Sequence, residues 1–206
     1  MMFYLLADSA ALFKPSSLCL EHLSKQLGAG KKIAYVGAAN GDETIYFELF
    51  CAAMERMQPA SLFHIAYPYN SASLKALAEA DLVVLAGGDV AIGWDKLSNS
   101  GFQAVCAALK ARNCIWLGIS AGAIHLGAGF FNYVPWFIGA HEEADGWQQT
   151  RLAYQQFGFL PTQTRCLGLK SGSAIAVTNT SFEIKNLSGE TLWLFPEACG
   201  ENDAKG

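Results

Sequence analysis

Short apolar segments alternate with helical segments through the first 130 residues, and this alternation limits the fold more than any other feature. Expected strands cover residues 3–7, 32–36, 62–66, 81–86 and 115–119, and expected helices cover 18–27, 43–57, 71–80 and 102–112. Nearly continuous apolar strands separated by helices are typical of a parallel sheet covered on both faces. We therefore expect an α/β fold, a three-layer sandwich with a mostly parallel sheet.

The pattern changes after residue 129, where an aromatic and irregular stretch begins. A helix is expected over 147–157, and short strands over 174–177, 182–185 and 192–195. Turn residues separate these strands, which favours antiparallel C-terminal strands in one ribbon that completes the same domain. The sequence has no linker or internal repeat, so we expect one domain over residues 1–206 with a frayed tail from residue 200.

The segment around Ser120 has the spacing of a nucleophile elbow. Gly118 and Gly122 bracket the serine as G-x-S-x-G, after an apolar strand and before a stretch of small residues. In such an elbow the serine lies on a sharp strand-to-helix turn, and the first helix amides can stabilise an oxyanion. A serine at such a joint can also be only a helix N-cap, and the motif alone leaves both readings open.

Composition restricts the class of protein. The chain is 52% hydrophobic with a formal net charge of −4, which argues against nucleic acid as a partner. Its six cysteines form no C-x-x-C pair and no zinc spacing, so buried free thiols in a reducing compartment are expected. The apolar N-terminus lacks a basic region and is too short for a signal peptide or membrane span. We expect a cytoplasmic protein without membrane contact.

A serine nucleophile needs a base, and the chain offers four histidines. His22 lies in the first helix and His64 inside a strand, while His125 follows Ser120 on the same helix and turns away from it. His141 lies in a polar segment after the aromatic stretch, where loops often carry catalytic groups. His141 is therefore the candidate base, with a surface histidine in an acidic turn as the alternative.

The acid of a triad is harder to assign. Residues 121–140 contain no Asp or Glu, so an acid cannot lie between Ser120 and His141 in the chain. Glu143 is the first choice, because residues i and i+2 of an extended segment point to the same side. Asp145 and Glu142 are the downstream alternatives, and an acid upstream of Ser120 also stays open. All three downstream carboxylates can equally be solvated surface groups.

A glycine pair, Gly87-Gly88, follows the fourth expected strand. The carboxyl ends of parallel strands meet at one edge of the sheet, where ligands bind, so this pair should lie near Ser120. Its amides have no side chain to block a substrate, although a plain turn explains a glycine pair equally well.

These segments together resemble the peptidase E and cyanophycinase family of serine peptidases. The resemblance rests on Ala86-Gly87-Gly88-Asp89, on Gly118-Ile119-Ser120-Ala121-Gly122-Ala123, and on His141 followed by Arg151-Leu152. It implies a class I glutamine amidotransferase-like fold with serine as the elbow residue. It also implies Ser120 as nucleophile, His141 as base, and the amides of Gly88 and Ala121 as the oxyanion hole.

The sequence departs from the family at three places. Val90 stands where the family often has threonine, and Lys170-Ser171 stand where cyanophycinases carry an acidic pair. Members that resemble peptidase E itself have an acid between serine and histidine, which this chain lacks. The third triad member and the substrate therefore do not carry over from the family.

The sequence favours a serine-type hydrolase, a peptidase that acts on a small peptide or amide substrate through an acyl-enzyme on Ser120. No metal or organic cofactor is expected. The alternative is a non-catalytic binding or regulatory domain that kept the fold and lost a complete triad. A glutaminase is disfavoured because Cys106 and Cys114 both lie off the elbow. Whether the chain is a monomer or a homodimer stays open.

Overall fold

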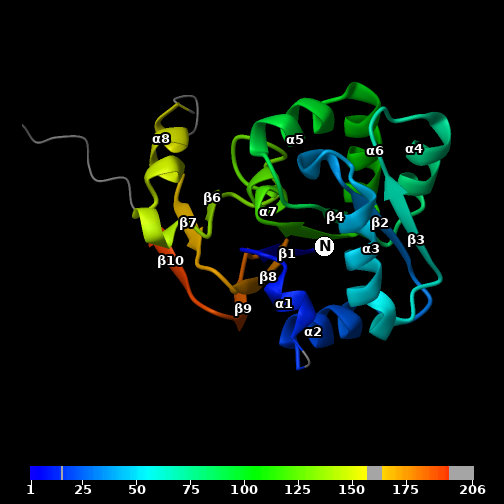
Figure 1. Ribbon diagram of the computed structural model, residues 1–206, viewed down its shortest axis with the longest axis horizontal. Coiled ribbons are helices and arrows are strands. Elements are labelled where there is room, and N and C mark those ends of the chain that lie inside the picture. The colour runs from blue at the N-terminus through cyan, green and yellow to red at the C-terminus, as the bar shows by residue number, and fades with distance from the viewer. Residues whose placement is uncertain (15, 157–163, 195–206) are drawn as a thin grey trace, which may run out of the picture.

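The computed structural model describes residues 1–14, 16–156 and 164–194. Its strands form a seven-stranded and a three-stranded sheet (Figure 1). The strands are β1 (Met2–Leu6), β2 (Lys32–Val36), β3 (Ser61–Ile65), β4 (Leu82–Leu85), β5 (Ile115–Ile119), β6 (Phe137–Ala140), β7 (Cys166–Leu169), β8 (Ala174–Thr178), β9 (Ile184–Ser188) and β10 (Thr191–Leu194).

Helices connect most of these strands. They are α1 (Ala10–Phe13), α2 (Leu18–Leu27), α3 (Thr44–Met54), α4 (Ser71–Ala78), α5 (Val90–Leu97), α6 (Ser100–Ala111), α7 (Ala121–Leu126) and α8 (Gln148–Gln156), with 3₁₀ turns η1 (Ala38–Asn40), η2 (Glu55–Met57) and η3 (Glu143–Asp145).

The large sheet has the strand order β3-β2-β4-β5-β1-β8-β9. The five strands from β3 to β1 run parallel, and β8 and β9 extend the sheet in antiparallel register. The expected mostly parallel sheet is therefore confirmed. Because β5 lies between β4 and β1, the loops that follow all three strands meet at one edge of the sheet.

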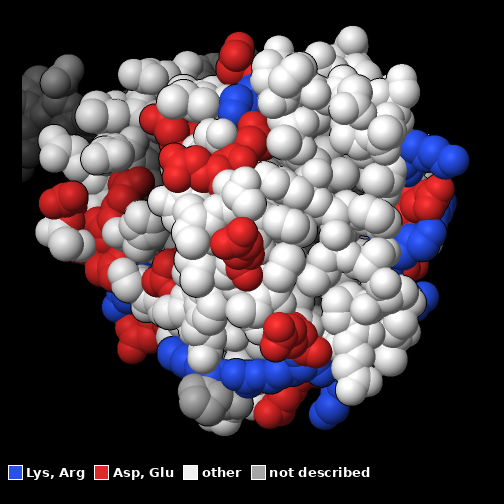
Figure 2. Space-filling view, turned by 45° about the vertical axis from the view of Figure 1, so that its right-hand side comes forward, with Lys and Arg blue, Asp and Glu red and all other residues white. Residues whose placement is uncertain are grey.

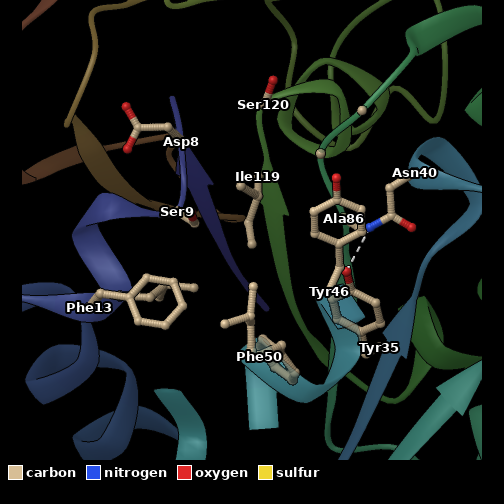
Figure 3. A pocket seen from close by; sticks show the side chains of 14 residues that line it. Asp8, Ser9, Phe13, Tyr35, Asn40, Tyr46, Phe50, Ala86, Ile119 and Ser120 are labelled. Atoms are coloured by element: carbon tan, nitrogen blue, oxygen red, sulfur yellow. Dashed lines mark hydrogen bonds between the residues drawn. The ribbon is translucent and has the colours of Figure 1, made fainter. Parts of the chain in front are cut away.

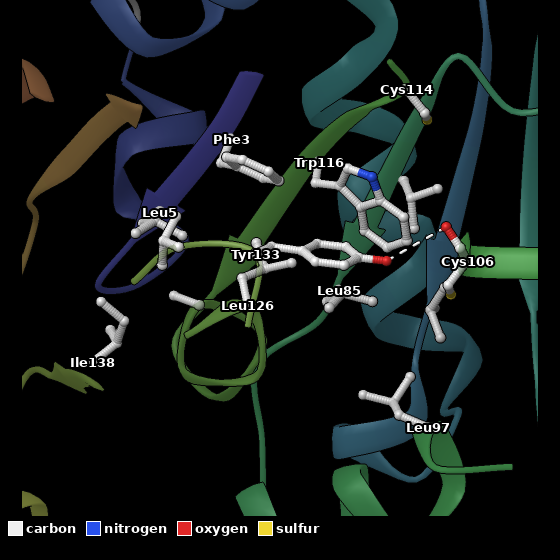
Figure 4. Close-up of a cluster of buried hydrophobic side chains, with 14 of the residues drawn as sticks. Phe3, Leu5, Leu85, Leu97, Cys106, Cys114, Trp116, Leu126, Tyr133 and Ile138 are labelled. Carbon is white, nitrogen blue, oxygen red and sulfur yellow. Dashed lines mark hydrogen bonds between the residues drawn. The ribbon is translucent and has the colours of Figure 1, made fainter. Parts of the chain in front are cut away.

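Alternate residues of each strand enter two separate cores, one on each face of the large sheet. On one face, Phe3, Val83 and Trp116 pack with side chains of α4 to α7 (Figure 4). On the other face, Tyr4 and Val84 pack with side chains of α1, α2 and α3. Helices thus cover both faces, which gives the predicted three layers and explains the continuous apolar strands.

The small sheet, with the order β10-β7-β6, differs from the expectation for the C-terminal strands. Strands β8 and β9 pair in the large sheet, but β10 pairs antiparallel with β7, and β7 pairs parallel with β6. The expectation of one antiparallel ribbon is wrong, because β10 leaves β9 for a strand that the sequence pattern did not reveal. The small sheet and α8 lie to one side of the large sheet (Figure 1).

Polar residues before two helices make defined contacts. Asp42, which precedes α3, has a positive φ of 61° and forms an ion pair with Lys96. Asn70 caps α4 through a reciprocal pair of hydrogen bonds with Ser73. Four expected features lie outside the described residues: the helix end at residue 157, the strand end at residue 195, Cys199, and the tail from residue 200.

The surface carries its charges unevenly. Figure 2 shows a face with acidic side chains gathered at the upper left and further acidic side chains near its middle, whereas basic side chains lie mainly along the lower and right edges. In the residues that the structure describes, no helix combines the length and hydropathy needed to cross a membrane.

Candidate active site

Ser120 joins the end of β5 to the start of α7 in a strained backbone conformation. Its φ is 50° and its ψ is −113°, values that an L-residue rarely adopts. Its amide donates to the carbonyl oxygen of Leu6 at 2.9 Å, so the last residue of β1 anchors the turn. The turn leaves Ser120 without a side-chain capping bond to the helix. The serine is thus held at an elbow and does not act as an ordinary N-cap.

The two glycines of the elbow are required by close packing of the backbone. A Cβ atom on Gly118 would overlap the backbone of Gly122, and one on Gly122 would overlap the carbonyl oxygen of Leu85 in β4. The helix start therefore lies directly against the sheet. This contact is the physical reason for the G-x-S-x-G spacing.

His141 meets Ser120 from the other sheet. It follows β6, and its amide donates to the carbonyl oxygen of Leu169 in β7 at 2.8 Å. Its φ is 48°, a second strained value for a non-glycine residue. This conformation brings Nε2 to 2.8 Å from the Oγ atom of Ser120. The distance suits proton transfer from a serine hydroxyl to an imidazole.

The glycine pair lies beside the serine, as the order of the strands predicts. A Cβ atom on Gly87 would lie 3.2 Å from the Cβ atom of Ser120, and Gly88 lines the same cavity as Ser120. Gly88 has a φ of 138°, and a side chain there would overlap the carbonyl oxygen of Ala39. Asp89 then caps α5 by accepting from the amide of Ile92 at 2.8 Å. The G-G-D sequence therefore turns the chain sharply and starts a helix.

Some backbone amides close to Ser120 have no hydrogen-bond partner among the described residues. Within the described residues, the amides of Gly88 and Ala121 donate no hydrogen bond. Ala121 is the first residue of α7, where a helix amide has no carbonyl partner within the helix. Both amides are therefore free to donate to a ligand beside Ser120.

The acidic residues after His141 take separate positions. Glu142 accepts from the amide and the hydroxyl of Thr150, both at 2.9 Å, and so caps α8 across eight residues. Glu143 accepts from the amide of Ser171 at 3.0 Å. Hydrogen bonding to Ser171, with a smaller contribution from His141, holds the pKa of Glu143 below its usual value.

The segment after His141 is not extended, so the expectation that placed Glu143 on the same side as His141 is wrong. Residues 143–145 form a 3₁₀ turn after the positive φ of His141. Among the described residues, no hydrogen bond joins Glu143 or Asp145 to the ring of His141. The interaction between Glu143 and His141 is a minor electrostatic contribution to the lowered pKa of Glu143.

Lys170 lies on the neighbouring loop but is already paired. Its Nζ atom lies 2.6 Å from a carboxylate oxygen of Glu190. The next two amides of this loop, those of Ser171 and Gly172, bind the carboxylates of Glu143 and Asp8. The loop therefore uses its backbone to hold two acidic side chains near the elbow.

The remaining histidines have structural surroundings. The ring of His22 lies 2.9 Å from the hydroxyl of Tyr4, and His64 stacks on Phe47. His125 is fully buried, with Nε2 2.9 Å from the carbonyl oxygen of Val90. Burial lowers its pKa, although the bond to Val90 opposes this shift. None of the three lies beside Ser120.

Asp8 is a site residue that the sequence reasoning missed. It follows β1, the neighbour of β5, and lines a cavity of about 310 Å³ together with Ser120. Asp8 also follows the carboxyl end of a parallel strand. The expectation that such strand ends meet at one edge of the sheet, which was applied to Gly87 and Ser120, could therefore have identified it. Within the described residues, no group of three His, Cys, Asp or Glu side chains could hold a metal ion.

Comparison with known proteins gives a fold but no close relative. No family model matches the sequence, and no curated protein matches it. A solved "Putative Peptidase E Protein" from Listeria monocytogenes EGD-e has a TM-score of 0.68 and 15% identity, covering 91% of this chain and 98% of that chain. A peptidase from an acI-B1 Actinobacterium has a TM-score of 0.64 and 16% identity, covering 94% and 96%. The chain therefore has a peptidase E-like fold, as the resemblance in its sequence predicts.

Proposed function

We propose that this protein is a serine-type hydrolase that cleaves a small peptide or amide through an acyl-enzyme on Ser120. The observation that carries the proposal is the 2.8 Å distance between Oγ of Ser120 and Nε2 of His141 at a strained elbow. The resemblance to two solved structures that are named peptidases supports a peptide bond as the target. Buried free cysteines among the described residues support a cytoplasmic location.

In the proposed reaction, Nε2 of His141 takes the proton of the Ser120 hydroxyl while Oγ bonds to the substrate carbonyl carbon. The amides of Gly88 and Ala121 donate to the oxyanion that forms. Nε2 then returns the proton to the leaving nitrogen as the carbon–nitrogen bond breaks. A water molecule releases the acyl group by the same steps in reverse order. Glu143 stabilises the charged imidazole during both steps.

A non-catalytic binding domain is the second candidate. It is favoured because, among the described residues, the His141 ring donates no hydrogen bond to a carboxylate. A triad normally uses such a bond to fix the imidazole tautomer.

Labelling with a fluorophosphonate probe separates the two candidates. We expect stoichiometric labelling of the wild type, and a burst of one equivalent of nitrophenol from a p-nitrophenyl ester. Ser120→Ala should lose both signals, whereas Ser181→Ala, a change at an exposed serine, should keep them. A wild-type protein that gives neither signal, or labelling that persists in Ser120→Ala, would contradict the hydrolase proposal.

A further inference from the structure

The cavity beside Ser120 is large enough to hold one substrate side chain. Its volume of about 310 Å³ is at the lower end of the range for small-molecule sites, ~300–1,000 Å³. It extends from the elbow down between α1 and α3, and its walls are mainly apolar (Figure 3). The apolar residues of the wall include Leu12, Phe13, Tyr46, Leu49, Phe50 and Ile119.

Three of these wall residues are unusually exposed for large apolar side chains. Phe13 is 45% exposed, Tyr46 is 47% exposed and Leu49 is 48% exposed. They come from two helices and line the same cavity, with Phe13 and Tyr46 on opposite sides (Figure 3). Exposed large apolar side chains that lie together are typical of a surface that binds a ligand.

Asp8 supplies the only charge among the residues that line this cavity. Its carboxylate is fixed by the amide of Ala10 at 2.8 Å and the amide of Gly172 at 2.7 Å. Asp8 and Ser120 lie at the same end of the cavity, away from Phe50 (Figure 3). Each carboxylate oxygen accepts one amide and keeps capacity for a further donor. A ligand group beside Ser120 therefore meets a fixed negative charge with no lysine or arginine in the lining.

We propose that this cavity selects substrates whose N-terminal residue has a large apolar side chain and a free amino group. The aromatic or branched aliphatic side chain would lie between α1 and α3, and the ammonium group would pair with Asp8. An acidic side chain would meet a like charge and no cation, which is unfavourable. This inference rests on the proposed function, since it assigns the residue whose carbonyl carbon Ser120 attacks.

The test compares aminoacyl coumarin amides of phenylalanine, leucine and aspartate, together with N-acetylphenylalanine coumarin amide. We expect kcat/KM for phenylalanine and leucine to exceed that for aspartate by ~10²-fold, and acetylation to lower the phenylalanine value ~10-fold or more. Diphenyl phosphonate analogues of phenylalanine and aspartate provide a second readout, because they report the rate of Ser120 labelling without turnover.

Variants assign the two recognition elements separately. Asp8→Asn should lower kcat/KM for the free phenylalanine amide and leave the acetylated amide nearly unchanged. Leu49→Arg should raise the aspartate value relative to phenylalanine, because it adds a cation to the wall. Ile45→Arg is the matched control: this residue is 53% exposed on the same helix but does not line the cavity. It should change none of these ratios.

The outcomes distinguish this inference from the proposed function. If the neutral fluorophosphonate labels Ser120 but the aspartate compounds react as fast as or faster than the phenylalanine compounds, the inference is wrong and the hydrolase proposal stands. Equal effects of Asp8→Asn on free and acetylated substrates would also overturn it. A protein without labelling or turnover would overturn the proposed function, and the inference with it.

Discussion

The Oγ atom of Ser120 lies 2.8 Å from Nε2 of His141, although the two residues follow strands of different sheets. Ser120 directly follows β5 of the large sheet, and His141 directly follows β6 of the small one. Between α7 and β6, the amide of Ala128 donates to the carbonyl oxygen of Trp136, the residue before β6, at 2.7 Å. The geometry of the candidate dyad therefore depends on how the small sheet docks against α7.

Replacing His141 tests the role of this pair directly. His141→Gln keeps a polar side chain of similar length but removes the base, so we expect turnover to fall by ~10³-fold or more. The rate of fluorophosphonate labelling of Ser120 should fall in parallel. His22→Gln, a change at a histidine that contacts Tyr4, should leave the labelling rate unchanged. Similar rates for both variants would show that His141 is not the base.

The two neighbouring glutamates make a matched comparison. Glu143→Gln removes a charge that influences His141, so we expect kcat to fall by ~10²-fold, at the lower end of general-base effects. Glu142→Gln should change kcat little, because Glu142 contacts Thr150 at the start of α8. The readout is kcat for both variants on one substrate, with urea unfolding as the control for stability. Equal small effects on kcat would show that neither carboxylate serves the dyad.

The elbow glycines should be intolerant of any side chain. Gly122→Ala places a methyl group into the carbonyl oxygen of Leu85, and we expect a loss of more than ~3 kcal/mol of unfolding free energy. Gly101→Ala is the control, because its new methyl group would meet only side-chain atoms of Asn99 and Leu74, each at 3.3 Å. Chemical unfolding of both variants checks this. A Gly122→Ala protein as stable as Gly101→Ala would mean that α7 does not lie against β4.

His125 should make the fold sensitive to mild acid. Its folded-state pKa is lowered by burial, so the unfolded chain binds a proton first as the pH falls below ~6.5. Stability that is present above this pH is then lost progressively until the pH falls below the folded-state pKa. His125→Gln can still donate to the Val90 carbonyl oxygen but does not titrate.

Urea unfolding at pH 7.5 and pH 5.5 measures this difference. We expect the wild type to lose more unfolding free energy between the two pH values than His125→Gln does. His22→Gln should reduce the loss less, because His22 is only partly buried. Identical pH dependence in the wild type and His125→Gln would assign the acid sensitivity to other groups.

The sequence alone determined the large sheet and the elbow. Strand β2 and helix α2 occupy the predicted residues 32–36 and 18–27, because a strand buried on both faces and an amphipathic helix each require a local pattern. The glycines around Ser120 could also be recognised in the sequence, since each one avoids a backbone collision in the turn from β5 into α7. These features depend on residues that are close in the chain.

Tertiary structure decided the remainder. The pairing of β10 with β7 and the contacts of Ser171 with Glu143 and of Gly172 with Asp8 all join residues that are far apart in sequence. Local patterns do not specify such pairings, because each one depends on how elements that are distant in the chain pack against each other. The sequence therefore supplied the serine and the histidine as candidates. The docking of the two sheets supplied their 2.8 Å contact, and the packing of α1 and α3 beside the ends of β1, β4 and β5 supplied the cavity next to Ser120.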